Sequence, residues 1–381
     1  MAVLTDFMAD IYAALPTFNR ELTGFIPAVN VDAKLAGASV NDTVKVPLVQ
    51  VASPKEYKQQ MDVPTPGQIT SDDVELKMDK ASYVSFPISG EIEEGLRFSG
   101  AGTTVVQQRF ESAFRQLANE MESYLAEKLV GGASRAVGTV GTVPFGKAGN
   151  LEDVALLNKI LNDNGSPISD RQLVLNTTAL ANMQANMSNL FRVNEYGSDA
   201  FLRSGFLNTP LQGMNIWASG GLKEHAKGAG SGYLVAAETA KGTKTFTVDT
   251  GSGSILAGDV ITVGSDKNKY VVNKGNEAAG PITIGAPGLL SAASDGDAVA
   301  ISDSFTPSVA FQKSAVAFGV RTPYIPSGGD AAIDRTVVQD PVTGIPFVIS
   351  VYGGRGMNTV EIAVVYGAGV LQPENVALLI Q

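Results

Sequence analysis

The sequence contains no cysteine and a single histidine, His225, among its 381 residues. Without cysteine there is no disulfide bond, no thiolate nucleophile and no cysteine-ligated zinc site. One histidine excludes His-rich metal sites and most Ser/His or Cys/His catalytic arrangements. His225 lies in a polar stretch that leads into glycines, and we predict that it is a solvated loop residue. The chain therefore lacks the side chains that most enzyme classes need for catalysis, and no cofactor or metal is expected.

Long hydrophobic runs are also missing. No run of about 20 apolar residues occurs, which excludes a membrane-spanning helix, and the first residues lack the basic and apolar regions of a secretory signal. The chain carries 38 acidic against 28 basic side chains, a net charge of −10. This balance argues against a dedicated nucleic-acid binder, because such proteins neutralise phosphates with Lys and Arg. With 44% hydrophobic residues, the chain can still bury substantial cores.

Two segments near the N-terminus have too few apolar residues to fold alone. Residues 1–42 hold one short amphipathic helix candidate, Asp6 to Leu15, and otherwise predict an arm that lies on another surface. Thr43 to Val51 and Ser82 to Ser89 alternate like strands, and Val74, Leu76 and Met78 also alternate. Residues 53–73, between the first of these strands and Val74, carry almost no core-forming side chains. The simplest geometry is a long hairpin whose tip needs a partner surface or stays mobile; an ordinary flexible loop is the alternative.

The segment from Thr103 to Val130 predicts one long helix of about 42 Å at 1.5 Å per residue. Its apolar side chains recur at helical spacing and form a single stripe, while polar residues, Glu122 among them, occupy the other faces. Gly131 and Gly132 supply a stop signal. We expect the stripe to pack into a core, through Phe110, Phe114, Leu117, Met121 and Leu125.

The remaining chain alternates between compact and strand-rich parts. Residues 228–305 show short alternating strands at regular spacing, which favours a small inserted barrel or sandwich. Thr336 to Gln381 is typical of an antiparallel meander. Before them lies an α/β unit with these predicted elements: an Asn150-capped helix from Leu151 to Asn162, a strand from Gln172 to Leu175, a helix from Thr177 to Met187 and a strand from Met214 to Ala218.

In the order of these parts, the sequence resembles the major capsid proteins of tailed bacteriophages, which share the Hong Kong 97-type fold. Thr43-Val-Lys-Val-Pro and the stretch from Val74 to Phe86 are similar to the two sides of that family's E-loop. Thr103 to Val130 is similar to its spine helix, and Gly213 to Ser219 to its A-domain strand. Ala257 to Val263 resembles the inserted domain of the coat-protein subgroup typified by Salmonella podoviruses.

The resemblance implies an α+β fold of the Hong Kong 97 type with six parts. These are an N-terminal arm (1–42), an E-loop with flanking strands (43–100), the spine helix of a P-domain (101–132), an A-domain (133–227), an inserted small β-barrel domain (228–305) and β strands that return to the A- and P-domains (306–381). It also implies that the E-loop tip contacts neighbouring subunits, through Lys55, Tyr57, Lys58, Met61, Pro64 and Pro66.

The function implied is that of a shell protein, not an enzyme. It would form pentamers and hexamers of an icosahedral capsid around double-stranded DNA, be assembled in the host cytoplasm and reside in the virion capsid. The implied partners are further copies of the chain, a portal protein, packaged DNA contacted non-specifically and, because only residues 1–42 precede the first E-loop strand, a separate scaffolding protein; no membrane is involved. Two alternatives stay open: another phage or surface structural protein with an adhesive β module, and a carboxylate-based hydrolase.

Overall fold

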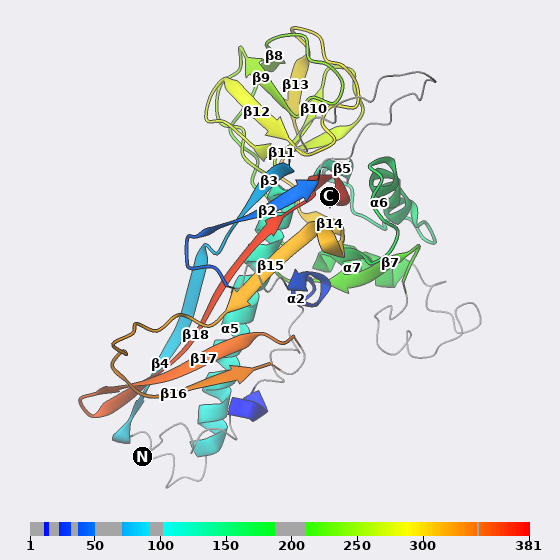
Figure 1. Cartoon of the computed structure of the whole chain (residues 1–381). Helices are drawn as coiled ribbons and strands as arrows, with labels where there is room; N and C mark the ends of the chain where they lie inside the picture. Colours follow the sequence, from blue (N-terminus) through cyan, green and yellow to red (C-terminus); the bar gives the residue numbers. More distant parts are fainter. Residues whose placement is uncertain are drawn as a thin grey trace, which may run out of the picture.

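One long helix, α5 (Gly102–Gly131), runs along an elongated lower body, and a small barrel stands at one end of that body (Figure 1). The helix exceeds the predicted span by one residue at each end. In the described part of the chain no helix combines the length and the apolarity needed to cross a membrane. The computed structural model describes residues 11–14, 23–31, 37–49, 71–91, 102–186, 210–340 and 343–381.

The apolar stripe of α5 packs against a six-stranded sheet. Phe110 meets Phe86 edge to face with ring centroids 5.3 Å apart, and Phe114 meets Phe347 at 5.2 Å. Such ring pairs stabilise a core beyond the area that they bury. The strands of this sheet are β1 (Asn30–Val31), β4 (Lys80–Ser89), β15 (Val316–Arg321), β16 (Ala332–Gln339), β17 (Pro346–Gly354) and β18 (Met357–Val370).

A two-stranded ribbon lies beside this sheet. It pairs β2 (Thr43–Val49) with β3 (Ser71–Lys77) in antiparallel register from Thr43 opposite Lys77 to Val49 opposite Ser71. Leu76 and Met78 are buried in a small core with Ala317 and Val365 of the sheet. The predicted base of the hairpin is therefore present, and it packs on the lower body.

An α/β unit occupies the middle of the molecule around a second apolar core. Its strands are ordered β5-β19-β14-β6-β7. The predicted Asn150 cap is displaced by one residue: α6 begins at Glu152 with Leu151 as its N-cap, although the Asn150 side chain still accepts a hydrogen bond of 2.9 Å from the Glu152 amide. The elements are β5 (Arg135–Gly138), α6 (Glu152–Asp163), β6 (Arg171–Leu175), α7 (Thr177–Asn186), β7 (Met214–Ala218), β14 (Pro307–Gln312) and β19 (Val376–Ile380).

The C-terminal segment is a meander only in part. Strands β16, β17 and β18 pair consecutively, as predicted, and Gly354 lies opposite Met357 at the β17–β18 turn. The last strand, β19, instead leaves this sheet and pairs with β14 antiparallel and with β5 in parallel. The prediction of one meander to Gln381 was therefore wrong, because β19 follows the short 3-10 helix η4 (Pro373–Asn375) into the other sheet. A similar turn, η3 (Lys313–Ala315), separates β14 from β15.

Six antiparallel strands between residues 233 and 301 close into a barrel with its own apolar core. The ring runs β8-β9-β12-β11-β10-β13 and returns to β8, since β10 pairs with both β11 and β13. One barrel strand, β11, also pairs with β5, so the barrel and the α/β unit share a continuous sheet. The strands are β8 (Tyr233–Val235), β9 (Thr245–Asp249), β10 (Val260–Val263), β11 (Lys269–Lys274), β12 (Gly280–Ile284) and β13 (Ala298–Ile301).

Candidate functional site: exposed sheet edges and the clamps behind them

The residues predicted to act fall into two groups. The stripe of α5 is fully buried against the six-stranded sheet, with 0% exposure of Phe110, Phe114, Leu117, Met121 and Leu125. The hairpin-tip residues lie outside the described residues; these are Lys55, Tyr57, Lys58, Met61, Pro64 and Pro66. The features that the structure adds are two carboxylate clamps on α5, a part-buried one at Asp79 and a buried one at Glu122, and one apolar row that is exposed at both ends.

The first clamp joins the base of the hairpin to α5. The Asp79 carboxylate, between β3 and β4, accepts hydrogen bonds from the Tyr124 hydroxyl and, at 2.9 Å, from Lys128 Nζ. Tyr124 Oη in turn accepts from the Ala368 amide at 3.1 Å, so three elements meet at one hydroxyl. Burial acts to raise the pKa of Asp79, but the hydrogen bonds from Tyr124 and Lys128 outweigh it and lower that pKa.

The second clamp joins α2 (Phe25–Ala28) to α5. Glu122 Oε1 accepts hydrogen bonds from the amides of Phe25, at 3.0 Å, and Ile26, at 2.9 Å. Its Oε2 accepts from the Ser219 hydroxyl at 2.8 Å, at the end of β7. The carboxylate thus caps the short helix, which has no cap of its own.

Glu122 is therefore not on a solvated face, which corrects the expectation from the sequence. It is 1% exposed, and burial raises the pKa of its carboxyl although its hydrogen bonds act to lower it. The chain after β7 passes close to α5 at Gly221, where a side chain would not fit, because a Cβ there would lie 2.9 Å from the backbone of Glu122. The partners of Glu122 are about a hundred residues away in sequence, so no local pattern marks it.

A third carboxylate fixes the foot of the barrel. The sequence predicted a solvated side chain for His225, but the structure shows it largely buried. Its Nε2 lies 2.8 Å from Asp259 Oδ1, and its ring packs on Phe305. Asp259, at 1% exposure, also accepts from the Leu256 amide at 2.8 Å. The prediction failed because Asp259, 34 residues along the chain, lies beside His225 only in the folded barrel. The role of His225 here is structural.

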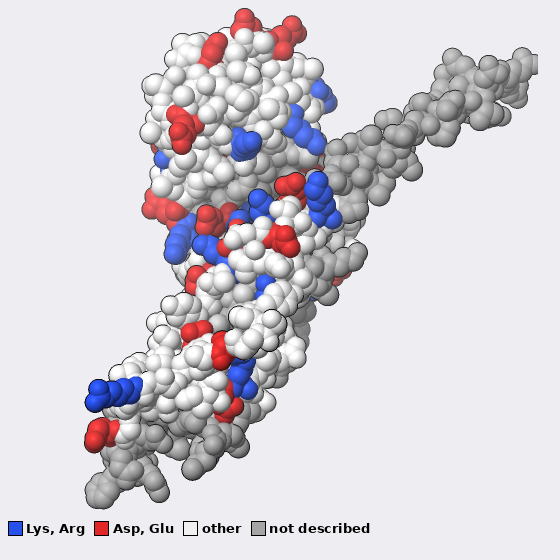
Figure 2. Space-filling view, turned by 60° about the vertical axis from the view of Figure 1, so that its left-hand side comes forward, with Lys and Arg blue, Asp and Glu red and all other residues white. Residues whose placement is uncertain are grey.

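The face of the six-stranded sheet that points away from α5 carries one apolar row. Across the strands, Val337 pairs with Val348, Val348 with Ala363, and Ala363 with Tyr83. The two ends of the row are exposed, Tyr83 by 65% and Val337 by 57%. Directly paired residues share one face of a sheet, so this row is continuous. Figure 2 shows few charged side chains over most of the lower body on the side it presents.

Within the described part of the chain, the row ends on strands that each pair with a single neighbour. Among the described residues, β4 pairs only with β18 and β16 only with β17. Pro87 lies within β4, which suits an edge strand because proline cannot donate to a ladder. Exposed apolar edges promote pairing with another chain. The described residues contain no group of three or more potential metal ligands.

Comparison with known proteins connects this fold to phages. No protein-family model and no curated protein sequence matches the chain. A solved structure from Mycobacterium phage Che8 is similar over 94% of this chain and 90% of that one, with 16% sequence identity and a TM-score of 0.50. The capsid of cyanophage P-SCSP1u is 12% identical over 95% of this chain and 87% of its own, with a TM-score of 0.46.

A capsid protein of the myovirus XM1 is also similar, with 10% identity over 94% of this chain and 91% of that one and a TM-score of 0.46. At these identities the likeness concerns the fold alone. The chain therefore has an α+β fold similar to that of the structure from phage Che8, so the resemblance to phage proteins drawn from the sequence is confirmed at the level of the fold.

Proposed function

We propose that this chain is the major capsid protein of a phage and that copies of it assemble into pentamers and hexamers of an icosahedral shell around double-stranded DNA. The observation that carries the proposal is the fold, which is shared with the structure from phage Che8 over 94% of the chain. The apolar row from Tyr83 to Val337, which is exposed at both ends, supports it, because a closed shell covers such edges with further copies of the subunit.

The parts of the fold suggest how a subunit would work in a shell of the Hong Kong 97 type. The helix α5 on its sheet would form the spine and P-domain (101–132), the α/β unit would form the A-domain (133–227), and the strands of 306–381 would return to both. The ribbon of β2 and β3 would be the base of the E-loop (43–100). The barrel would be the inserted domain (228–305), and residues 1–42 the arm that the Glu122 clamp holds to the spine.

The two clamps suggest how the hairpin base and α2 could keep fixed positions in an assembled shell. Asp79 fixes the hairpin base and Glu122 fixes α2, so both segments leave the body from defined positions. The tip of the hairpin, with Lys55, Tyr57 and Lys58, would then reach a neighbour from a rigid base. Each contact in such a shell could be weak, since symmetry repeats it many times.

The proposed location is the virion capsid, after assembly in the host cytoplasm. The proposed partners are other copies of the chain, a separate scaffolding protein, a portal protein and packaged DNA contacted without sequence preference. The net charge of −10 suits a container that does not grip its cargo tightly.

Two matched substitutions test the proposal. Val337→Lys places a charge at the exposed end of the apolar row, whereas Val143→Lys places the same charge at a similarly exposed valine (44%) in the α/β unit. We expect both variants to fold, by circular dichroism, and only Val143→Lys to form closed particles in electron microscopy. Normal particles from Val337→Lys would show that this edge is not an assembly surface.

A further inference from the structure

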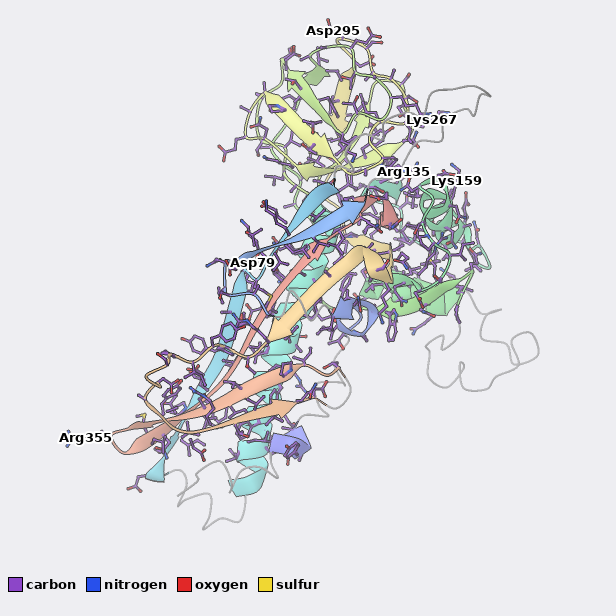
Figure 3. All side chains as sticks on the ribbon, in the orientation of Figure 1. Asp79, Arg135, Lys159, Lys267, Asp295 and Arg355 are labelled. Atoms are coloured by element: carbon purple, nitrogen blue, oxygen red, sulfur yellow. The ribbon has the colours of Figure 1, made fainter. Side chains whose placement is uncertain are left out.

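A cleft of about 270 Å³ lies where the foot of the barrel meets β5 and α6. Four basic side chains line it: Arg135 of β5, Lys159 of α6, Lys267 of the turn before β11, and Lys269 at the start of β11. Figure 3 shows Arg135, Lys159 and Lys267 on these neighbouring elements at the base of the barrel. The site thus forms only where three separate segments come together.

The charge of this lining is unusual for an acidic chain. No Asp or Glu lines the cleft, whereas a larger cleft beside α5 mixes Lys80 and Lys223 with glutamates. Two carboxylates stand at its margin: Asp163, 3.7 Å from Lys159 Nζ, and Asp266, which accepts from the Tyr270 hydroxyl. Four cations face two anions, which leaves an excess of about two positive charges to be matched.

Arg135 is held with part of its hydrogen-bonding capacity unused. Its side chain is buried, at 3% exposure, and its Nη2 donates to the Ile160 carbonyl at 3.2 Å and to Asn164 Oδ1 at 2.8 Å. Within the described part of the chain, the buried Nε has no partner. A buried guanidinium with an unsatisfied donor costs stability unless something else satisfies it.

The lysines can complete such a site. Lys269 Nζ donates to the Gly138 carbonyl, which keeps its ammonium at the cleft and leaves further donors for a ligand. The Lys159 side chain is 69% exposed, and Lys267 is exposed as well. Both have long flexible stems that can bring an ammonium group over a bound anion.

We propose that this cleft binds a phosphate dianion, either free phosphate or the terminal phosphate of a nucleotide. A dianion matches the excess charge, and a tetrahedral oxyanion offers enough acceptors for an arginine fork and several ammonium groups. A carboxylate would carry only one of the two charges. The proposal stands on the folded subunit alone and does not depend on the assembly of a shell.

Isothermal titration calorimetry of the full-length protein with inorganic phosphate, in phosphate-free buffer at moderate salt, tests this site. We expect saturable binding that weakens about tenfold in Lys159→Ala and in Lys267→Ala, because each removes one charge-assisted hydrogen bond. Lys241→Ala, at an exposed lysine in the β8–β9 loop of the barrel, is the matched control and should bind like the wild type. These lysines are exposed, so all three variants should fold.

Adenosine monophosphate is the second probe. Binding comparable to that of inorganic phosphate would show that the cleft accepts a nucleotide's terminal phosphate, and binding of inorganic phosphate alone would show that it takes the free ion. The proposal is overturned if phosphate does not bind saturably, or if the Lys159→Ala/Lys267→Ala double variant binds it unchanged. Binding of a short DNA duplex without binding of phosphate would also overturn it, in favour of a backbone-contact surface. Particle formation by the same variants separates this result from that for the proposed shell function.

Discussion

Two carboxylates hold the separate parts of the lower body to α5, and they do so with opposite electrostatic consequences. Asp79 receives strong donors from Tyr124 and Lys128, so its charged form is favoured and its pKa is lowered. Glu122 is more deeply buried, so its pKa is raised in spite of its donors. Each is positioned by partners distant in sequence, and each fixes a described segment, the hairpin base or α2, to α5.

The Glu122 clamp predicts a specific loss of stability. Glu122→Ala leaves the amides of Phe25 and Ile26 and the Ser219 hydroxyl without their acceptor. We expect the free energy of unfolding to fall by about 3 kcal/mol, since each buried group left unsatisfied costs about 1–3 kcal/mol. Urea unfolding followed by circular dichroism measures this. Glu127→Ala, at an exposed glutamate of the same helix, should change stability by less than about 0.5 kcal/mol; equal effects of the two changes would rule out the clamp.

The Asp79 clamp predicts a pH dependence with a definite sign. Because the folded-state pKa of Asp79 lies below its ordinary value of 3.8, its ionisation stabilises the fold above that pH, and this contribution disappears as the pH falls through the folded-state pKa. The difference in unfolding free energy between the wild type and Asp79→Asn should therefore be present at pH 7 and shrink below pH 3.8. A difference that stayed constant between pH 7 and pH 2.5 would mean that the charge of Asp79 contributes nothing.

Among the elements, α5 depends most on its packing against the six-stranded sheet. Leu117 is fully buried near the middle of the helix. Leu117→Ala should lower the free energy of unfolding by about 2–5 kcal/mol, through lost burial and the cavity that remains. Gln108→Ala, at an exposed position of the same helix, should stay within about 0.5 kcal/mol of the wild type in the same urea titration. A small effect of Leu117→Ala would mean that the sheet and helix do not share a core.

Elements with a strong local signal could be predicted from the sequence. The stripe of α5 predicted its span to within one residue at each end, and the strand from Met214 to Ala218 was predicted with its observed bounds. These patterns arise because burial on one face selects apolar residues at the period of the element. The four-residue strand β5 was missed, since so short a segment carries too little periodicity.

What could not be predicted depends on contacts between distant segments. The parallel pairing of β19 with β5 joins residues 377–380 to residues 135–138, and the sequence of neither segment indicates which strand it pairs with. The same holds for the Glu122 clamp and for the apolar row from Val337 to Tyr83, which exists only in the register of four strands. For the hairpin tip, the sequence expectation stays a prediction.

The whole molecule consists of a thin body and a barrel joined by continuous β structure. Because β11 pairs with β5, and β5 with β19, the barrel continues the central sheet and is not a separate domain joined only by a linker. The buried Asp259 at its foot adds a second point of attachment through His225. Figure 1 shows the resulting elongated form, with the barrel at one end and the hairpin of β17 and β18 near the other.

Cryo-electron microscopy of the purified full-length chain tests the central claim most directly. The account predicts closed icosahedral particles in which the outer edges of β4 and β16, with Tyr83 and Val337, are covered by neighbouring copies. Folded protein that stays monomeric, or particles in which both edges face solvent, would contradict it.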